Sequence, residues 1–109
     1  MNPNWDKEQF LAYVLLYAAF ADLELNPVEE EYIEEKVGKE EYADVKAEFT
    51  ADTDKDRAYK IIAYSQGEEF DNEYVQMVLN DMDDLFLADG DYTHWEKAIK
   101  RALMRLMNI

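Results

Sequence analysis

The most apolar stretch of the chain runs from Phe10 to Phe20, where every residue is aliphatic or aromatic. No polar stripe interrupts this run. A helix that is apolar on all sides belongs inside a protein, and this run is too short to cross a bilayer. The pattern therefore predicts a buried central helix, which we extend to about Ala21. Asn2 or Asn4 is expected to cap its start.

Downstream of this run, apolar residues recur at three- and four-residue spacing, and no stretch alternates like a strand. Asn26, Pro27 and Gly38 are typical of the start and the end of a helix. The predicted helices after the first cover residues 27–37, 40–49, 53–66, 71–88 (or from 68) and 94–107. The sequence thus predicts an all-α fold, a single compact bundle of five to seven helices over residues 1–109.

The segment 50–66 carries two specific expectations. Residues 50–56 hold three acids on alternate positions and are predicted to form a loop in which these acids cap the next helix. In that next helix, we expect Tyr59, Ile62 and Ala63 to be buried. In the last helix, we expect Ala98, Ala102, Leu103 and Leu106 to face the core, with Trp95 and Ile99 at its start.

Composition narrows the possible chemistry. The chain has 109 residues, of which 49% are hydrophobic, with three glycines and two prolines. A single domain of this length has a radius of gyration of roughly 13 Å. Because there is no cysteine and only one histidine, His94, any metal site would use oxygen ligands. Such ligands favour calcium, magnesium or manganese.

Charge narrows the possible partners. The chain has 26 acidic and 11 basic residues, a net charge of −15. This charge opposes binding to nucleic acid and to anionic membranes, and favours cations or basic proteins. From residue 92 onward the balance reverses, and we expect the basic side chains there to lie beside acidic surface of the same chain. These basic residues are Lys97, Lys100, Arg101 and Arg105. No signal peptide is apparent, so a cytoplasmic location is expected.

An acidic turn near the start of the chain is repeated near its end. When Asp22 is aligned with Asp89, Glu29 falls on Glu96. The apolar positions after each turn also correspond, which indicates an internal pseudo-repeat of a helix–acidic turn–helix unit. Chance similarity is the alternative, since Asp and Glu are common in this chain. If the halves pack about a pseudo-twofold axis, six acids could converge on a divalent cation: Asp22, Glu24, Glu29, Asp89, Asp91 and Glu96.

The alternative for these six acids is an ordinary structural role. Asp is frequent in turns, and Glu in the first turn of a helix favours capping and the helix dipole. Neither turn is an EF-hand, because Pro27 and His94 stand where that loop needs glycine. No phosphate loop and no nucleophile–base pair is present, so we expect no enzymatic activity.

The repeated unit resembles the signature of the TerB-like family of tellurite-resistance proteins, which has an Ala-Asp-Gly turn and a Glu seven residues after the Asp. Residues 88–90 together with Glu96 match it, and Ala21-Asp22 with Glu29 match it except for Leu23 in place of glycine. The resemblance implies a duplicated helical fold and a role in stress or tellurite response. It also implies divalent-cation binding by Asp22, Glu29, Asp89 and Glu96.

Two functional hypotheses follow. The first is a non-enzymatic, TerB-like module that binds a divalent cation where the acidic turns converge. The second is an acidic decoy or adaptor that mimics nucleic acid toward a basic protein. The first requires converging carboxylates, whereas the second requires them exposed in a stripe.

Overall fold

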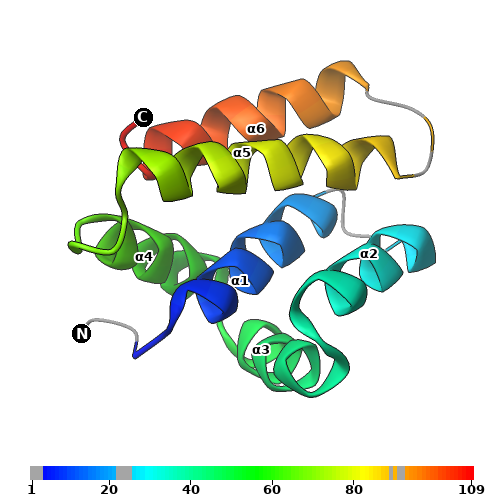
Figure 1. Cartoon of the computed structure of the whole chain (residues 1–109), viewed down its shortest axis with the longest axis horizontal. Coiled ribbons are helices and arrows are strands. Elements are labelled where there is room, and N and C mark those ends of the chain that lie inside the picture. Colours follow the sequence, from blue (N-terminus) through cyan, green and yellow to red (C-terminus); the bar gives the residue numbers. More distant parts are fainter. Residues whose placement is uncertain (1–3, 22–25, 89, 91–92) are drawn as a thin grey trace.

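The computed structural model describes residues 4–21, 26–88, 90 and 93–109, which form six α-helices and contain no strand. These residues confirm the predicted all-α bundle. Figure 1 shows that α1 runs through the middle of the molecule with the other helices around it. The helices are α1 (Lys7–Ala19), α2 (Pro27–Val37), α3 (Lys39–Ala51), α4 (Asp54–Ser65), α5 (Asn72–Leu87) and α6 (His94–Leu106).

The central position of α1 follows from its apolar sequence. Phe10, Tyr13 and Val14 have no exposed surface, and nearly every other residue from 10 to 19 is buried. All five other helices contact α1. The radius of gyration is 12.7 Å, close to the value expected from the chain length. The predicted central helix is therefore confirmed.

The cap of α1 differs from the prediction. Asp6, and not Asn2 or Asn4, is the N-cap: its carboxylate accepts a hydrogen bond from the Gln9 N–H at 2.8 Å. The Gln9 side chain in turn accepts from the Asp6 N–H, which completes a capping box. The prediction chose asparagine further upstream, although aspartate caps equally well and is followed by glutamine at the third helical position.

The connections between helices α2, α3 and α4 are very short. Gly38 alone joins α2 to α3, with a φ of 94° that favours glycine over residues with a side chain. The predicted loop over residues 50–56 is wrong, because α3 continues to Ala51 and α4 begins at Asp54. The predicted capping in this segment is present: Thr53 and Asp56 form a capping box at the start of α4.

Four predicted core positions are wrong. Tyr59 and Ile62 are 52% and 37% exposed, and the adjacent Ile61 is fully buried instead. In α6, Ile99 and Leu103 are buried as predicted, whereas Ala102 and Trp95 are exposed. The apolar face predicted for α4 lies one position away from the observed one.

Within the part of the chain that the structure describes, no helix is both long and apolar enough to span a membrane.

Candidate functional site

The two acidic turns lie largely outside the described residues. Four of the six predicted ligands lie outside the described residues: Asp22, Glu24, Asp89 and Asp91. Only Glu29 and Glu96 of the six predicted ligands are described. Elsewhere in residues 4–21, 26–88, 90 and 93–109, no three acidic or histidine side chains are grouped as a metal site requires. Convergence of all six acids therefore stays a prediction.

Glu29 lies in the first turn of α2 and is only 7% exposed. The N-cap Asn26 accepts from the Val28 N–H at 2.8 Å. A buried glutamate is unusual, because a carboxylate loses favourable hydration when it is removed from water. Burial distinguishes Glu29 from its exposed neighbour Glu31 and from the solvated carboxylates along the same helix.

Glu96, the counterpart of Glu29 in the repeat, serves the helix cap of α6. Its Oε1 accepts the Thr93 N–H at 2.9 Å and the Thr93 hydroxyl at 3.2 Å, while the Glu96 N–H donates to that hydroxyl. This arrangement is a capping box. The capping alternative is thus correct for Glu96, whose carboxylate holds the start of α6.

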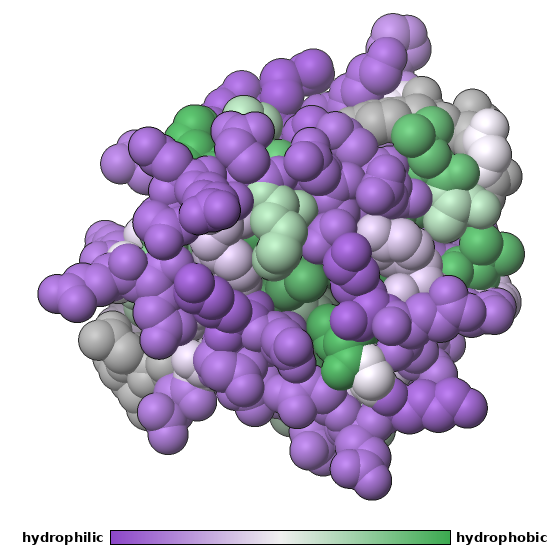
Figure 2. All heavy atoms as spheres, viewed as in Figure 1, coloured by the Kyte–Doolittle hydropathy of each residue, from purple (hydrophilic) through white to green (hydrophobic). Residues whose placement is uncertain are grey.

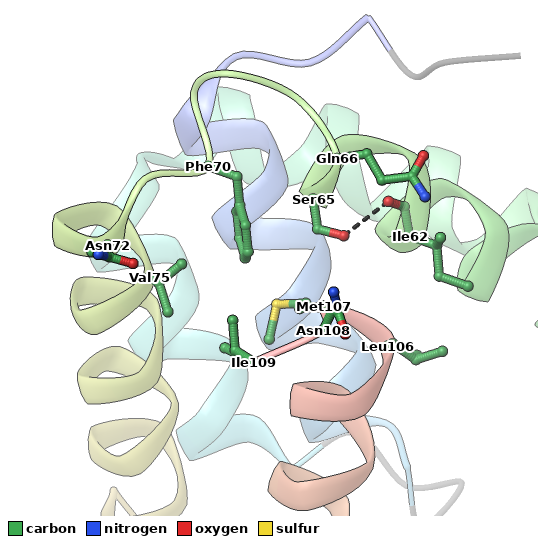
Figure 3. Close-up of a pocket in the computed structure, with 10 residues that line it drawn as sticks. All are labelled: Ile62, Ser65, Gln66, Phe70, Asn72, Val75, Leu106, Met107, Asn108 and Ile109. Carbon is green, nitrogen blue, oxygen red and sulfur yellow. Dashed lines mark hydrogen bonds between the residues drawn. The ribbon is translucent and has the colours of Figure 1, made fainter.

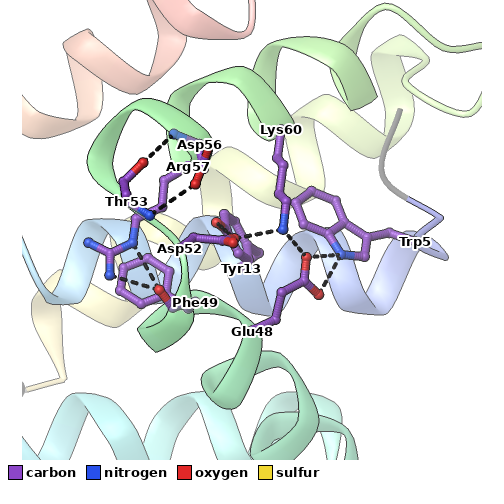
Figure 4. A network of polar contacts seen from close by, with 9 residues as sticks. All are labelled: Trp5, Tyr13, Glu48, Phe49, Asp52, Thr53, Asp56, Arg57 and Lys60. Carbon is purple, nitrogen blue, oxygen red and sulfur yellow. Dashed lines mark hydrogen bonds and ion pairs between the residues drawn. The ribbon is translucent and has the colours of Figure 1, made fainter. Parts of the chain in front are cut away.

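A polar network that the sequence did not predict joins α1, α3 and α4 (Figure 4). At its centre, the Lys60 ammonium lies 2.7 Å from Asp52 Oδ2 and 2.8 Å from Glu48 Oε2. The Tyr13 hydroxyl donates to the same Asp52 oxygen at 2.6 Å. The Trp5 indole N–H donates to both Glu48 oxygens, at 3.1 and 3.2 Å, and so ties the N-terminal segment to α3.

The electrostatics of this network favour a structural role. The pKa of the Tyr13 phenol is raised by burial first and then by its hydrogen bond to Asp52. For Lys60, burial acts to lower the pKa, but the hydrogen bonds and charges of Asp52 and Glu48 have the larger effect, and the net pKa is raised. The raised pKa values keep both Tyr13 and Lys60 protonated at neutral pH. Neither group is prepared to act as a general base at neutral pH.

Arg57 extends the network to the end of α3. Its Nε and Nη2 donate to the Phe49 carbonyl at 3.0 and 2.7 Å, and its guanidinium lies 3.9 Å from the centre of the Phe49 ring. Its Nη1 also contacts Asp54 at 3.2 Å. Every nitrogen of the Arg57 guanidinium therefore has a partner within the chain, and Arg57 stabilises the α3–α4 junction.

A second buried acid lies between α2 and α5. Asp81 is 4% exposed, and its Oδ1 is 3.0 Å from the Lys36 ammonium. Its Oδ2 is buried and has no hydrogen-bond partner among the described residues. Nearby, burial and the charges of Asp81 and Asp84 raise the pKa of Tyr32 to about 12. Asp81 is a single buried carboxylate held by one lysine.

The structure also contains a cleft of about 460 Å³ between the end of α4, the start of α5 and the end of α6 (Figure 3). Phe70, Val75 and Met107 point into it. The Ser65 hydroxyl, on its wall, donates to the Ile62 carbonyl at 2.8 Å. None of the side chains that line the cleft is charged. They offer no nucleophile with an adjacent base.

A groove of a different character lies between the first turns of α1 and α5, with a volume of about 550 Å³. Leu11 and Tyr74 form its floor, and Met77 on its wall is 41% exposed. Its other lining residues are all charged: Lys7, Glu8, Asp71 and Glu73.

The basic residues of the last helix partly meet the prediction. Lys100 lies 2.8 Å from Asp83 on α5, as expected for a cation beside acidic surface of the same chain. Arg101 and Arg105 are exposed. Lys97 also has an interaction within the chain. The prediction therefore holds for Lys100, whose acidic partner is Asp83.

Comparisons with protein-family models, curated proteins and solved structures gave no match.

Proposed function

We propose that this chain is a non-enzymatic acidic helical module that binds a basic protein segment through exposed carboxylates. One observation carries the proposal: of the acidic side chains that the structure describes, only Glu29 and Asp81 are buried. The face drawn in Figure 2 is accordingly dominated by hydrophilic side chains. Acids spread over a surface suit a cationic macromolecule, whereas a cation site requires them to converge.

The way in which basic residues are used supports the same proposal. The described ion pairs of Lys36, Lys46, Lys60 and Lys100 all join acids of the chain itself. With 26 acids and 11 bases, internal pairing cannot neutralise the surface. The excess negative charge would steer a basic partner toward the module.

The proposal that the module is not an enzyme rests on the surroundings of the usual catalytic groups. His94 is exposed in the first turn of α6. The one serine, Ser65, donates its hydroxyl to a backbone carbonyl. A nucleophile needs an adjacent base to activate it, and neither residue has such a partner among the described residues.

The basic-partner proposal is tested with a synthetic amphipathic peptide made of leucine, alanine and lysine. Isothermal titration at physiological salt should give saturable binding that weakens as sodium chloride is raised, since part of the attraction is screened. A peptide with glutamine in place of lysine is the control and should not bind. Absence of saturable binding by the lysine peptide would overturn the proposal.

A second candidate function is divalent-cation binding in the manner implied by the TerB-like resemblance. It is favoured by the burial of Glu29, a predicted ligand at the start of α2. A buried glutamate is usually paired or bound to a metal, and Glu29 already has an interaction within the chain. The proposed ligands remain Asp22, Glu24, Glu29, Asp89, Asp91 and Glu96, and the proposed ion is calcium, magnesium or manganese.

The cation proposal is tested by calorimetric titration of wild type, Asp22→Asn and Asp89→Asn with each ion. If the turns form one site, both substitutions should weaken binding strongly, because each removes a ligand charge. Without metal they should be neutral or stabilising, because they relieve repulsion among acids. Glu31→Gln, at an exposed acid of α2, is the control. No saturable binding to wild type at millimolar ion would end this candidate.

A further inference from the structure

The groove between the first turns of α1 and α5 combines an apolar surface with an acidic rim. Leu11 is 3% and Tyr74 5% exposed at its floor, whereas Met77 is 41% exposed. Glu8 on α1 and Glu73 on α5 are both exposed beside it. An exposed flexible methionine is a side chain well suited to contact a partner's apolar residue.

The two helices that form the groove are fastened to each other at this point. The Tyr74 hydroxyl on α5 donates to the Lys7 carbonyl on α1 at 2.5 Å. Asp71 caps α5 by accepting the Tyr74 N–H at 2.8 Å. The floor is therefore built by fixed contacts, so a ligand would meet a largely preformed surface.

Negative charge is concentrated around this groove beyond the residues that line it. The pKa of Tyr74 is raised by burial first, then by Tyr64 and by the carboxylates of Asp6 and Glu69. The pKa of Glu41, on the neighbouring α3, is likewise raised by burial first and then by Asp6 and Glu8. Acids from α1, α3 and the start of α5 thus share this end of the molecule.

The chain already places one cation of its own in the groove. The Lys7 ammonium lies 5.3 Å from the centre of the Tyr74 ring, within the range of a cation–π contact. Lys7 is exposed, and the Tyr74 ring is the contact that the structure describes for its ammonium group. Its position shows that the face of the Tyr74 ring accommodates an alkyl ammonium group.

We infer that the groove between α1 and α5 docks a basic amphipathic segment of a partner protein. This inference rests on the proposed function and assigns its site. Cations of the segment pair with Glu8 and Glu73, and an apolar side chain covers the exposed Met77. Charge complementarity selects this occupant: an acidic or neutral peptide would leave the rim carboxylates unpaired.

The leucine–alanine–lysine peptide tests this site on variants matched in charge. Glu8→Gln/Glu73→Gln should weaken binding about three- to tenfold, as expected for two exposed ion pairs. Glu31→Gln/Glu35→Gln on α2 removes the same charge away from the groove and should have a smaller effect. Circular dichroism and thermal melting of each variant verify that it is folded.

Two single substitutions separate the apolar and the cationic parts of the site. Met77→Ala should weaken peptide binding, whereas Leu87→Ala, at a residue that is also exposed, should not. Lys7→Gln should strengthen binding, because it removes the internal cation from the Tyr74 ring. Lys39→Gln, at the first position of α3 as Lys7 is of α1, makes the same change in charge and should strengthen binding less.

The possible results separate this inference from the proposed function. If wild type binds the peptide and the groove variants lose more affinity than their matched controls, the inference is supported. If wild type binds but groove and control variants lose affinity equally, the module binds basic segments elsewhere and the groove is not the site. If wild type does not bind, the proposed function fails, and the inference fails with it.

Discussion

At the scale of single residues, Arg57 makes several contacts at the α3–α4 junction. Two of its nitrogens donate to the Phe49 carbonyl, and its guanidinium covers the Phe49 ring. Only Asp52 and Thr53 separate α3 from α4. Arg57, in the first turn of α4, therefore binds a backbone carbonyl at the end of α3 and holds the two helix ends together. Only a planar group with several donors can make both contacts at once.

Arg57→Lys should therefore lower the free energy of unfolding by about 1–2 kcal/mol, since a lysine keeps the charge but loses the paired hydrogen bonds and the stacking. Urea unfolding followed by circular dichroism measures the change. Arg101→Lys, at an exposed position of α6, is the control and should lie within about 0.5 kcal/mol of wild type. Equal effects of the two substitutions would show that the Arg57 geometry contributes nothing.

Tyr32 makes the free energy of unfolding change with pH in the alkaline range. Its pKa is raised to about 12 by burial first and then by Asp81 and Asp84, whereas an unfolded tyrosine titrates near 10. A group whose pKa is raised in the folded state contributes stability that is full below the unfolded pKa. That contribution is lost as pH rises through the folded pKa.

Wild type should therefore lose stability relative to Tyr32→Phe as pH rises from about 10 toward about 12, while the difference between the two stays constant near neutral pH. Urea unfolding of both proteins along a pH series measures this difference. A constant difference over the whole series would contradict the shift of Tyr32.

At the scale of elements, the Lys36–Asp81 pair joins α2 to α5 through a buried carboxylate with one unpartnered oxygen. Lys36→Met should destabilise the protein by about 1–3 kcal/mol, because it leaves the buried charge without compensation. Lys36→Met/Asp81→Leu should recover this loss or exceed it, because an apolar pair has no desolvation penalty. A double-mutant cycle from urea unfolding measures both. A double variant less stable than Lys36→Met would contradict this expectation and would mean that Asp81 stabilises the protein through contacts other than Lys36.

Helices were predictable from the sequence because their signals are local. Asn26, Gly38 and Thr93 mark helix ends through hydrogen bonds or a φ angle that depend on a few neighbouring residues. The inward face of α4 was not predictable in this way. Tyr59 and Ile62 are apolar and regularly spaced, but which side of α4 meets α1 is decided by tertiary packing around Ile61.

The candidate sites show the same limit more strongly. The role of Glu96 in a capping box follows from a four-residue pattern and could be read from the sequence. The network of Tyr13, Asp52 and Lys60 joins residues far apart in the chain, and no local pattern announces it. The available signal was the presence of two tyrosines, Tyr13 and Tyr17, in an otherwise apolar run, since a buried hydroxyl requires a partner.

At the scale of the whole molecule, the dominant quantity is the net charge of −15. At low salt the Debye length of about 30 Å is comparable with the molecular dimensions of 35 × 28 × 25 Å, so nearly all charges interact. At physiological salt it is about 8 Å, less than the radius of gyration of 12.7 Å. The self-repulsion of the folded chain should therefore depend strongly on ionic strength.

Adding sodium chloride to physiological strength should raise the urea midpoint. Salt also weakens ion pairs such as Lys100–Asp83, but these are partly exposed and worth well under about 1 kcal/mol each. Because acids outnumber bases by 26 to 11, relief of repulsion outweighs the loss of pairs. Glu35→Gln removes one exposed acid and should stabilise the protein by a few tenths of a kcal/mol at low salt, about the size of surface substitutions. This gain should vanish at high salt. A midpoint that falls as salt is added would mean that the internal ion pairs, and not the excess acids, control the stability of the bundle.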